Sequence, residues 1–429
     1  MTCADNKFKS VYERRIHGEK LMRNSECRMC KSRDMYRFLD LGEHPPSDAF
    51  LKKEQLGNPE PKFPLDVYFC KNCGLVQLGF VVQPELMFNK DYVYVTSVSK
   101  THDRLFGQFA EDVVRKFSLS GSLVVEMGSN DGTFLKHFKR LGCKVLGVDP
   151  SGAAQLAAKS GIDTINDFFT EKISSNILKE RGRAGAITGT NVFAHIHDLD
   201  DVMRGVNLLL DDDGVFIIES PYLVSLVENL EFDTIYHEHL SYLAIRPLSM
   251  FFGRFGMEIF DVERTAIHGG SIRVFVKKKK GKWQVSTAAK ELIALEKKMG
   301  LDAPETYDRF AARVANLREN LVGMMKRLKA ENKRIVGNGA PAKGNTLLNY
   351  CKIGTDLIDY IVEINPIKQG LYTPGMHIPV LPLEKIDVDK PDYMLILPWN
   401  LKDDIMNQEQ RIRKWNGKFI IPIPEPKIV

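Results

Sequence analysis

Long apolar runs are missing from this sequence of 429 residues. None approaches the ~18 residues that a helix needs to cross a bilayer, so we expect neither a membrane-spanning protein nor a membrane partner. The first 24 residues are polar and mixed in charge, without the apolar core of a signal peptide. We therefore expect a flexible N-terminal tail, residues 1–24, on a cytoplasmic protein.

A large excess of one charge is also missing. Lys and Arg number 60, Asp and Glu number 55, and the formal net charge is +5. This mild balance permits an anionic substrate, and no stripe of basic and aromatic residues marks a nucleic-acid surface. A zinc-ribbon protein that binds or modifies nucleic acid remains an alternative, but we expect no nucleic-acid partner.

Cysteine is scarce, with seven residues in the chain, which is too few for a disulfide scaffold. Four of them form two pairs, Cys27-x2-Cys30 and Cys70-x2-Cys73. Two such pairs supply the four thiolates that a closed tetrahedral zinc site takes. We predict a structural zinc centre at these cysteines. Four buried cysteines without metal, or a redox CxxC pair, are the less favoured alternatives.

The remaining composition is ordinary for a globular protein, and the length allows two to four domains. From about residue 123, strand-like runs alternate with helical spacers (SLVVEMGSNDG, TFLKHFKRLG, KVLGVDPS), which favours an α/β fold with a parallel, doubly wound sheet. We expect IRVFVKKKKGKW to be the edge hairpin of that sheet. RIVGNGAPAKGNTLLNY repeats the strand–turn–helix plan and predicts a second, smaller Rossmann-like α/β unit. The expected domains are 25–95, 96–285 and 286–429.

The turn EMGSNDG follows the first strand of the central unit and opens a helix. Its glycines allow close approach of a ligand to the backbone, and the helix start offers unpaired N–H groups. Because GxGxxG is absent, an NAD oxidoreductase is disfavoured and S-adenosylmethionine (SAM) fits better. Asp149, at the end of the next strand, is placed to bind ribose hydroxyls. The candidate SAM contacts are Glu126, Gly128, Asn130, Asp131, Gly132, Asp149, Asp167 and Phe168; a plain strand-to-helix turn, with the phenylalanine in the core, is the alternative.

Histidines gather in two segments. FDTIYHEHLSYL places Tyr236, His237, Glu238 and His239 side by side, and His195 follows another expected strand. An imidazole titrates near neutrality and is a natural general base. A single histidine is more often a structural hydrogen-bonding group, and a His-x-His pair is also a possible metal site, although the HExxH spacing of zinc hydrolases is absent.

The second glycine turn, VGNGAPAKGN, follows a strand and precedes a helix. Its backbone and Lys343 can meet a diphosphate, although no P-loop pattern is present. Lys343, Asn345, Glu363 and His377 are the candidate substrate contacts. The alternative is a packing turn with a solvated lysine.

These motifs occur in one order: the four-cysteine segment, EMGSNDG, YHEH, HGGSIR, VGNGAPAKG and NPIKQGLYTPGMHIPV. The chain resembles the sugar C-methyltransferases that methylate C-3 of a nucleotide-linked 4-keto deoxysugar. The resemblance covers nearly the whole sequence. It implies a zinc-binding domain, a central SAM domain and a C-terminal domain that helps to hold the nucleotide sugar, in a monomer.

The resemblance also implies site residues. Tyr236, Glu238 and His239 match an active-site Tyr-x-Glu-His, with His239 as the base, and His195 matches a second active-site histidine. The segment DYVY resembles a tyrosine-bearing stretch that reaches the site, through Tyr92 or Tyr94. The implied substrate is a dTDP- or GDP-linked sugar.

The residue types suit this chemistry. A C-4 ketone acidifies the C-3 hydrogen, so the enzyme needs a base at C-3, donors near the C-4 oxygen and a methyl sulfonium held in line. His239 is the expected base, its tautomer set by Glu238 or Tyr236, and His195 or a tyrosine hydroxyl the expected donor. An O- or N-methyltransferase on the same scaffold is the main alternative.

Overall fold

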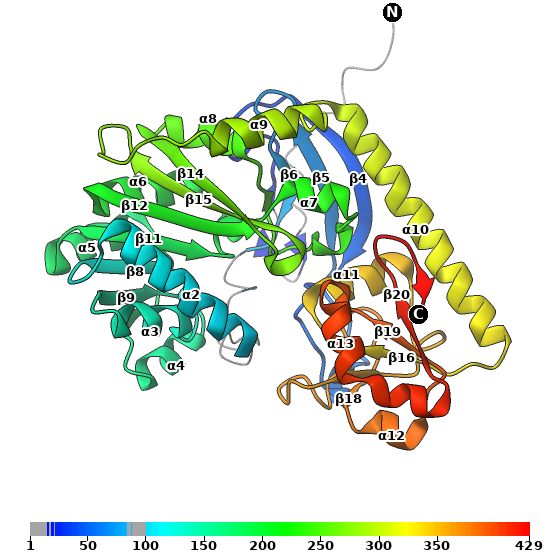
Figure 1. Cartoon of the computed structure of the whole chain (residues 1–429). Coiled ribbons are helices and arrows are strands. Elements are labelled where there is room, and N and C mark those ends of the chain that lie inside the picture. Colours follow the sequence, from blue (N-terminus) through cyan, green and yellow to red (C-terminus); the bar gives the residue numbers. More distant parts are fainter. Residues whose placement is uncertain (1–14, 17–18, 21, 84–86, 88–99) are drawn as a thin grey trace, which may run out of the picture.

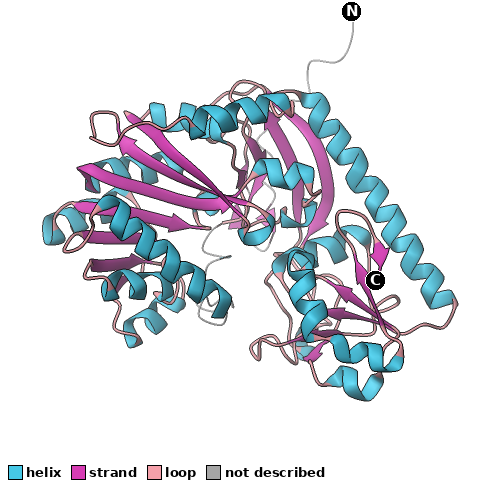
Figure 2. Cartoon of the chain, in the orientation of Figure 1, coloured by secondary structure: helices cyan, strands magenta, loops and turns pink. Residues whose placement is uncertain are grey.

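A computed structural model of the chain describes residues 15–16, 19–20, 22–83, 87 and 100–429 (Figure 1). Tyr92 and Tyr94, two of the predicted site residues, lie outside this range. Among the described residues, no helix combines the length and the apolar character that crossing a bilayer requires. Strands form three main sheets with helices packed around them (Figure 2).

The N-terminal sheet is antiparallel and has the order β13-β6-β5-β4. Its consecutive strands are β4 (Met35–His44), β5 (Phe63–Cys70) and β6 (Val76–Leu78). The outer strand β13 (Ser241–Tyr242) comes from far along the chain and pairs with β6 in the register Ser241 opposite Gln77 and Tyr242 opposite Val76. Two residues that come shortly after the predicted histidine segment are therefore part of the N-terminal sheet.

Short two-residue strands flank this unit: β1 (Arg15–Ile16) pairs with β2 (Glu19–Lys20), and β3 (Met22–Arg23) pairs with β7 (Phe80–Val81). A 3-10 turn, η1 (Lys53–Gln55), lies between β4 and β5.

The central sheet has seven strands in the order β10-β9-β8-β11-β12-β15-β14. The first five strands are parallel, and β15 is antiparallel to both of its neighbours. Their bounds are β8 (Leu123–Met127), β9 (Lys144–Val148), β10 (Thr164–Ile165), β11 (Ala184–Thr190), β12 (Leu210–Pro221), β14 (Met257–Thr265) and β15 (Ser271–Lys278).

The prediction of a doubly wound α/β sheet is confirmed, but the placing of IRVFVKKKKGKW at the sheet edge is wrong. That segment is β15, which lies between β12 and β14, and β14 forms the edge. Burial explains the arrangement, because Val274, Phe275 and Val276 are at most 1% exposed, as expected of a strand covered on both faces.

Helices cover both faces of this sheet. Val124 faces a cluster with α2 (Lys100–Phe117) and α3 (Thr133–Arg140), whereas its neighbours Leu123 and Val125 face the cluster that holds α5 (Glu171–Arg181) and α6 (Leu199–Leu209). This alternation is the two-residue period of a strand. Helix α4 (Ala153–Lys159) links β9 to β10, while α7 (Leu223–Glu228) and α8 (Ile245–Gly253) follow β12.

The C-terminal unit repeats the α/β plan with six strands in the order β18-β17-β16-β19-β20-β21. The first five are parallel and β21 is antiparallel. The strands are β16 (Ile335–Asn338), β17 (Ile361–Glu363), β18 (Val380–Pro382), β19 (Tyr393–Ile396), β20 (Lys418–Ile421) and β21 (Lys427–Ile428). The helices are α11 (Ala342–Cys351), α12 (Lys385–Asp389) and α13 (Lys402–Gln408), with 3-10 turns η6 (Trp399–Leu401) and η7 (Gln410–Trp415).

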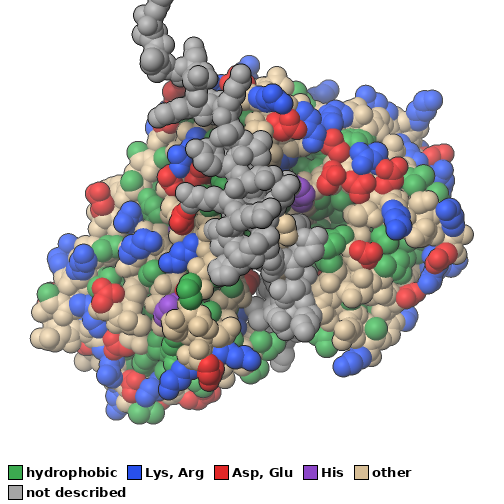
Figure 3. All heavy atoms as spheres, turned by 180° about the vertical axis from the view of Figure 1, so that it is seen from behind, with side chains coloured by type: hydrophobic (Ala, Val, Ile, Leu, Met, Phe, Trp, Pro, Cys, Tyr) green, Lys and Arg blue, Asp and Glu red, His purple; other side chains and the backbone are tan. Residues whose placement is uncertain are grey.

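Two helices connect the central and C-terminal units. Helix α9 (Ala288–Lys298) packs on α8 and β14, and the long α10 (Pro304–Ala330) contacts β4 and α11. In Figure 1, α10 runs in yellow along the outer side of the molecule, from the N-terminal sheet to the C-terminal unit. Seen from behind, acidic and basic side chains are interspersed over the described surface (Figure 3).

The parallel pairing decides where ligands can bind. In an open α/β sheet, the carboxyl ends of neighbouring parallel strands meet at one edge, where ligand sites form. The turns after β8, β9, β11 and β12 therefore share one edge of the central sheet. The turns after β8, β9 and β11 carry most of the predicted SAM contacts and His195, while Asp167 and Phe168 follow β10.

Candidate active site and metal centre

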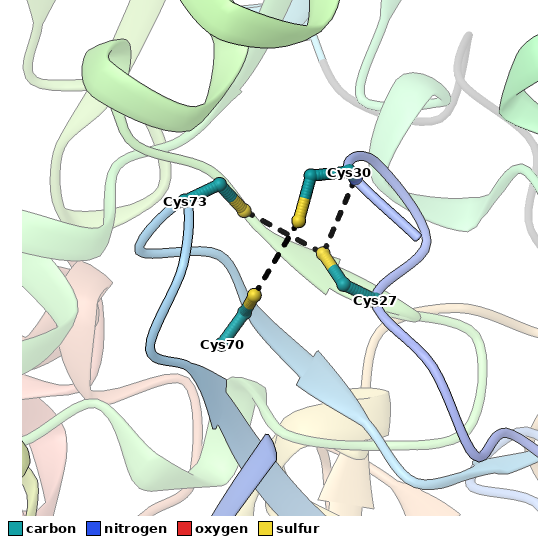
Figure 4. Close-up of side chains that lie close together, drawn as sticks. All are labelled: Cys27, Cys30, Cys70 and Cys73. Carbon is teal, nitrogen blue, oxygen red and sulfur yellow. Dashed lines mark hydrogen bonds between the residues drawn. The ribbon is translucent and has the colours of Figure 1, made fainter. Parts of the chain in front are cut away.

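The four predicted metal ligands lie together (Figure 4). The sulfur atoms of Cys27, Cys30, Cys70 and Cys73 are all within 4.8 Å of one another, with Cys27–Cys73 at 3.5 Å and Cys30–Cys70 at 3.6 Å. Four sulfurs at ~2.3 Å from a central zinc ion would be ~3.8 Å apart, so the cluster has the size and the donor set of a closed zinc site.

Each cysteine pair closes through a left-handed residue. Lys31 follows the first pair with φ 62°, and Gly74 follows the second with φ 87°. The amides of these two residues donate to the carbonyls of Cys27 and Cys70, at 3.0 and 2.8 Å. A further donor, the amide of Cys30, points at the Cys27 sulfur at 3.5 Å. The N–H group of Cys30 stabilises negative charge on the Cys27 thiolate, as expected of a thiolate that binds a cation.

The first glycine turn contains three left-handed residues: Gly128 (φ 65°), Asn130 (φ 50°) and Gly132 (φ 75°). A Cβ atom at Gly128 would lie 2.7 Å from Val192 Cγ2, so a side chain does not fit there. Val192 belongs to the segment that leads to His195. The glycine turn and the His195 segment therefore pack directly against each other.

The carboxylates in and beside this turn are buried, and each accepts a hydrogen bond from a neighbouring residue. Asp149 accepts hydrogen bonds from the amides of Asn130 (2.8 Å) and Ser151 (2.9 Å), which fixes the turn after β8 to the end of β9. Asp131 accepts from the amide and hydroxyl of Thr133 at the start of α3. Burial raises the pKa of Glu126 well above its ordinary value, and Thr190 donates to it at 3.2 Å.

The last two SAM candidates lie beyond β10. Asp167 is exposed, and its carboxylate accepts from the amide of Phe168 at 2.7 Å. Phe168 is half-buried, whereas its neighbour Phe169 is 8% exposed and belongs to the core. Glu126, Asp149 and the residues of the turn after β8 thus lie at one edge of the central sheet. Asp167 and Phe168 follow the neighbouring strand β10.

Three of the predicted catalytic side chains form one cluster. The rings of Tyr236 and His239 are 4.0 Å apart, and those of His239 and His195 are 4.9 Å apart. His195 ends a 3-10 turn, η3 (Phe193–His195), directly after β11, while Tyr236 and His239 follow η4 (Phe232–Thr234). Segments more than 40 residues apart in sequence thus bring their polar rings together.

A backbone carbonyl fixes the orientation of His239. Its Nδ1 atom is 2.8 Å from the carbonyl oxygen of Thr234. A carbonyl only accepts, so Nδ1 carries the proton of the neutral ring and the lone pair is on Nε2. We expected Glu238 or Tyr236 to set the tautomer of His239, but the group that accepts from Nδ1 is the main-chain carbonyl of Thr234.

Burial keeps the second histidine uncharged, because it lowers the pKa of His195 to about 4. A neutral imidazole has one donor and one acceptor nitrogen. The site therefore combines an oriented imidazole, His239, with a neutral neighbour, His195, and a phenol, Tyr236.

Glu238 and His237 lie on the buried side of the segment. Burial, reinforced by the nearby Asp48 carboxylate, raises the pKa of Glu238 to about 8, and its Oε2 atom has no hydrogen-bond partner among the described residues. His237 Nε2 is 3.2 Å from the Phe63 carbonyl, and burial lowers the pKa of His237 to about 4. Both residues face the N-terminal unit.

Residues outside the predicted site residues hold this segment. Trp399 Nε1 donates to Asp233 at 2.7 Å, and the Thr346 hydroxyl donates to the Ile235 carbonyl at 3.1 Å, so the C-terminal unit anchors one side. The Leu240 amide donates to the Ala194 carbonyl at 2.9 Å, joining the two histidine segments. No sequence pattern singles out Asp233, because the stretch before YHEH (VENLEFDTI) contains several acidic residues.

The predicted substrate contacts in the C-terminal unit all have hydrogen-bond partners within the protein. Lys343 donates to Asn400 Oδ1 at 3.1 Å and lies 5.4 Å from the Trp399 ring centroid. Asn345 donates to the Ser47 carbonyl at 2.7 Å, and Glu363 accepts from the amide of Ala340 at 2.7 Å. These two side chains thus serve internal contacts in this structure.

His377, the fourth of these candidates, has positive φ (53°), and its Nε2 atom is 2.5 Å from Glu60 Oε1. Glu60 belongs to the N-terminal unit, before β5. His377 therefore joins the two units, and Lys343 lies beside Trp399, which donates to Asp233 before the histidine segment.

The zinc centre generates the first prediction. Cys70→Ser removes one thiolate, so the protein should lose its zinc, about one ion per chain by elemental analysis, and its Tm should fall by about 5 °C or more. Cys143→Ser is the matched control, because Cys143 is also buried and its thiol donates to the Leu119 carbonyl, which a hydroxyl can also do. Full zinc content in Cys70→Ser would contradict the four-sulfur site.

Glu238 generates a prediction on pH and stability. Its pKa is about 8 in the folded chain against an ordinary value of 4.5. The folded state therefore holds the proton more tightly, and this contribution to stability is present below pH 4.5 and is lost as the pH rises through 8. Glu238→Gln stays neutral at every pH. Relative to the parent chain, it should gain stability between pH 5 and 9, by ~1.4 kcal/mol per pKa unit at most.

Denaturant unfolding at several pH values measures this difference. Glu425→Gln, which removes an exposed carboxylate, is the control and should give a curve parallel to that of the parent protein. Parallel curves for Glu238→Gln and the parent would mean that the Glu238 carboxyl is ionised in the folded chain.

Three family models match the chain in succession. A model described as "Putative zinc binding domain" matches residues 27–88, one described as "Methyltransferase domain" matches residues 101–262, and one described as "C-methyltransferase C-terminal domain" matches residues 266–424. The first match contains the four clustered cysteines, and the second contains the glycine turn after β8.

One named relative aligns over almost the full length. The chain is 36% identical over 406 residues to C-methyltransferase NovU of Streptomyces niveus, covering 94% of this chain and 96% of the relative. Solved structures align with about two fifths of the chain. A SAM-dependent methyltransferase of Archaeoglobus fulgidus has a TM-score of 0.34 at 14% identity, covering 41% of this chain and 94% of its own.

A second solved structure, the magnesium protoporphyrin IX methyltransferase ChlM of Synechocystis PCC 6803 with bound SAH, has a TM-score of 0.31 at 16% identity, covering 41% of this chain and 82% of its own. The full-length relative and the successive model matches agree with the clustered thiolates and the glycine turn. The chain belongs to the C-methyltransferase family, and it is a SAM-dependent enzyme that also binds zinc.

Proposed function

We propose that this C-methyltransferase transfers the methyl group of SAM to C-3 of a nucleotide-linked 4-keto-6-deoxysugar, by way of an enolate. The resemblance of the motif series to sugar C-methyltransferases suggests the substrate class. The single observation that supports the chemistry most strongly is the orientation of His239, whose Nδ1 proton is committed to the Thr234 carbonyl at 2.8 Å.

In this proposal His239 is the base at C-3. Its Nε2 lone pair takes the C-3 proton, and the electron pair of the broken C–H bond moves toward the C-4 carbonyl oxygen. The imidazolium that forms keeps its hydrogen bond to Thr234, which spreads part of the new charge onto the main chain. Positioned base catalysis of this kind contributes ~10²–10⁴ in rate.

His195 and Tyr236 are the proposed stabilisers of the enolate oxygen. The pKa of His195 is about 4, so its ring is neutral at physiological pH and can donate one N–H without competing for the C-3 proton. The Tyr236 hydroxyl is the second donor, held beside His239 by the 4.0 Å ring contact. Donors that are in place before the charge forms stabilise it most effectively.

When bound, SAM would supply an electrophilic methyl group to the carbon that His239 deprotonates. The chain's part is to hold the two reactants in line. The residues suited to hold the donor are those of the Gly128–Gly132 turn together with Glu126 and Asp149, and Asp167 and Phe168 remain proposed contacts. Val192 joins this turn to the His195 segment.

The C-terminal unit is the proposed holder of the nucleotide. Lys343 is the proposed cation for a diphosphate, because it lies beside Trp399, whose indole N–H reaches the η4 turn before His239. Asn345, Glu363 and His377 stay proposed contacts, each needing to give up its present partner. The zinc ion has four sulfur ligands and takes no step in the reaction.

The base assignment predicts that His239→Asn loses ~10²–10⁴-fold in kcat while SAM binds with unchanged affinity. Steady-state kinetics and calorimetric titration with SAM measure the two quantities. His197→Asn is the control, since His197 is an exposed residue of the neighbouring segment. Near-normal turnover in His239→Asn would falsify the assignment of the base.

The position of the new methyl group separates C- from O-methylation. With dTDP- or GDP-linked 4-keto-6-deoxysugars and SAM, we expect a product with a methyl singlet on a quaternary carbon in the proton NMR spectrum. In deuterium oxide with S-adenosylhomocysteine in place of SAM, the C-3 proton should exchange. A methoxy signal, or no exchange and no turnover with either nucleotide, would refute the proposed substrate.

A further inference from the structure

Arg28 connects the zinc centre with the His195 segment. It lies between the ligands Cys27 and Cys30, its side chain is buried, and its Nη2 atom donates to the carbonyls of Ile196 and His197, both at 3.0 Å. These carbonyls belong to the two residues that follow His195. No function for Arg28 follows from its position in a CxxC pair, where the intervening residues are usually solvated.

The backbone of the same residue is tied to β6, the strand that pairs with β13 just after the other histidine segment. The Arg28 amide donates to Gln77 Oε1 at 2.8 Å, and Gln77 Nε2 donates to the Glu26 carbonyl at 3.0 Å. Gln77 lies in β6, opposite Ser241 of β13, two residues after His239. Leu78, also in β6, donates to the Leu240 carbonyl at 3.1 Å.

We propose that Arg28 is a positioning residue for the active site, through which the metal-bound Cys27–Cys30 loop holds His195 at its distance from His239. This inference rests on the proposed function, in which the two histidines act on one substrate. The zinc ion fixes the loop, the loop fixes Arg28, and the guanidinium fixes the carbonyls directly behind His195.

The physical reason is that the two carbonyls have a buried, charged donor in common. A buried acceptor that loses its donor is left without compensation for its lost hydration, so removal of the guanidinium favours movement of the segment toward water. The segment is short: it begins at Val192, which contacts the glycine turn, and ends at His197. A shift of ~1 Å in a reacting group can cost ~10²-fold in rate.

A second arginine provides a matched control. Arg254 also joins the Cys27–Cys30 loop to the central unit, because its Nη1 atom donates to the Met29 carbonyl and its guanidinium pairs with Asp200 at 2.9 Å. Among the described residues, its hydrogen-bond and ion-pair partners, Met29 and Asp200, lie outside the segment Phe193–His197. Loss of Arg254 therefore weakens the docking of the loop without removing the contact behind His195.

The experiment compares Arg28→Met, Arg28→Lys and Arg254→Met in the full-length, zinc-loaded protein. Met keeps an unbranched apolar stem and removes all donors, whereas Lys keeps one charged donor group. The measurements are zinc content, SAM affinity, kcat and KM with the keto sugar, and the imidazole NMR signals of isotopically labelled histidine. His195→Asn and His239→Asn identify the two relevant signals, which need no substrate.

We expect all three variants to keep about one zinc ion and to bind SAM within about twofold of the parent protein. Arg28→Met should lose ~10–100-fold in kcat with little change in KM, and the His195 signal should move. Arg28→Lys should recover part of the rate, since one ammonium can reach at least one carbonyl. Arg254→Met should resemble the parent in both rate and His195 signal.

Unchanged kcat and an unmoved His195 signal in Arg28→Met would overturn the proposal, as would an equal loss in Arg254→Met, which would point to loop docking alone. If Arg28→Met loses zinc or fails to fold, Arg28→Lys decides, and parent-like turnover together with a parent-like His195 signal in that variant overturns it. If the parent enzyme does not act on keto sugars, the proposed function fails, while the histidine signals still test the role of Arg28.

Discussion

The backbone of Leu240 joins the segments on which the site depends. Its amide donates to Ala194, beside His195, and its carbonyl accepts from Leu78 of the N-terminal sheet. One residue after His239, these two main-chain bonds connect the central unit, the histidine segment and the zinc-bearing unit. These main-chain bonds fix the spacing between the backbone segments that carry the two imidazoles.

Several titratable side chains around the histidine segment are uncharged at neutral pH. Burial holds the pKa values of His195 and His237 at about 4 and that of Glu238 at about 8, so none of the three carries a charge at neutral pH. A charge that forms on a bound substrate would then meet no competing fixed charge from these groups. Neutral donors aimed at such a charge are more effective in a buried site than in water, since solvent does not screen them.

Local patterns predicted the local structure well. Cysteine spacing predicted the thiolate cluster, and the run ending in EMGSNDG predicted β8, its left-handed turn and α3, because propensity and short-range hydrogen bonds decide these features. The place of β15 inside the sheet was not predicted, since strand order depends on pairing between distant segments. The pairing of β13 with the N-terminal sheet was not predicted either, for the same reason.

The site shows the same division. The rings of Tyr236, His239 and His195 form one cluster, yet the acceptor for His239 Nδ1 is a carbonyl, which no side-chain pattern reveals. Asn345 and Glu363 were chosen as polar residues near a glycine turn, and the structure uses both for internal hydrogen bonds. The sequence shows which polar side chains are present, but not which of them form hydrogen bonds inside the folded protein.

The inclusion of β13 in the N-terminal sheet has a consequence for protein engineering and for evolution. A recombinant chimera that took its first hundred residues from one family member and the remainder from another would have to preserve a seam across which two residues of the central unit complete a sheet of the first. Without a matching seam, β6 would be left as an open edge, a known starting point for aggregation. Inheritance of the metal-bearing module is therefore bound to inheritance of the segment around the histidines, despite the ~170 residues of chain that separate them.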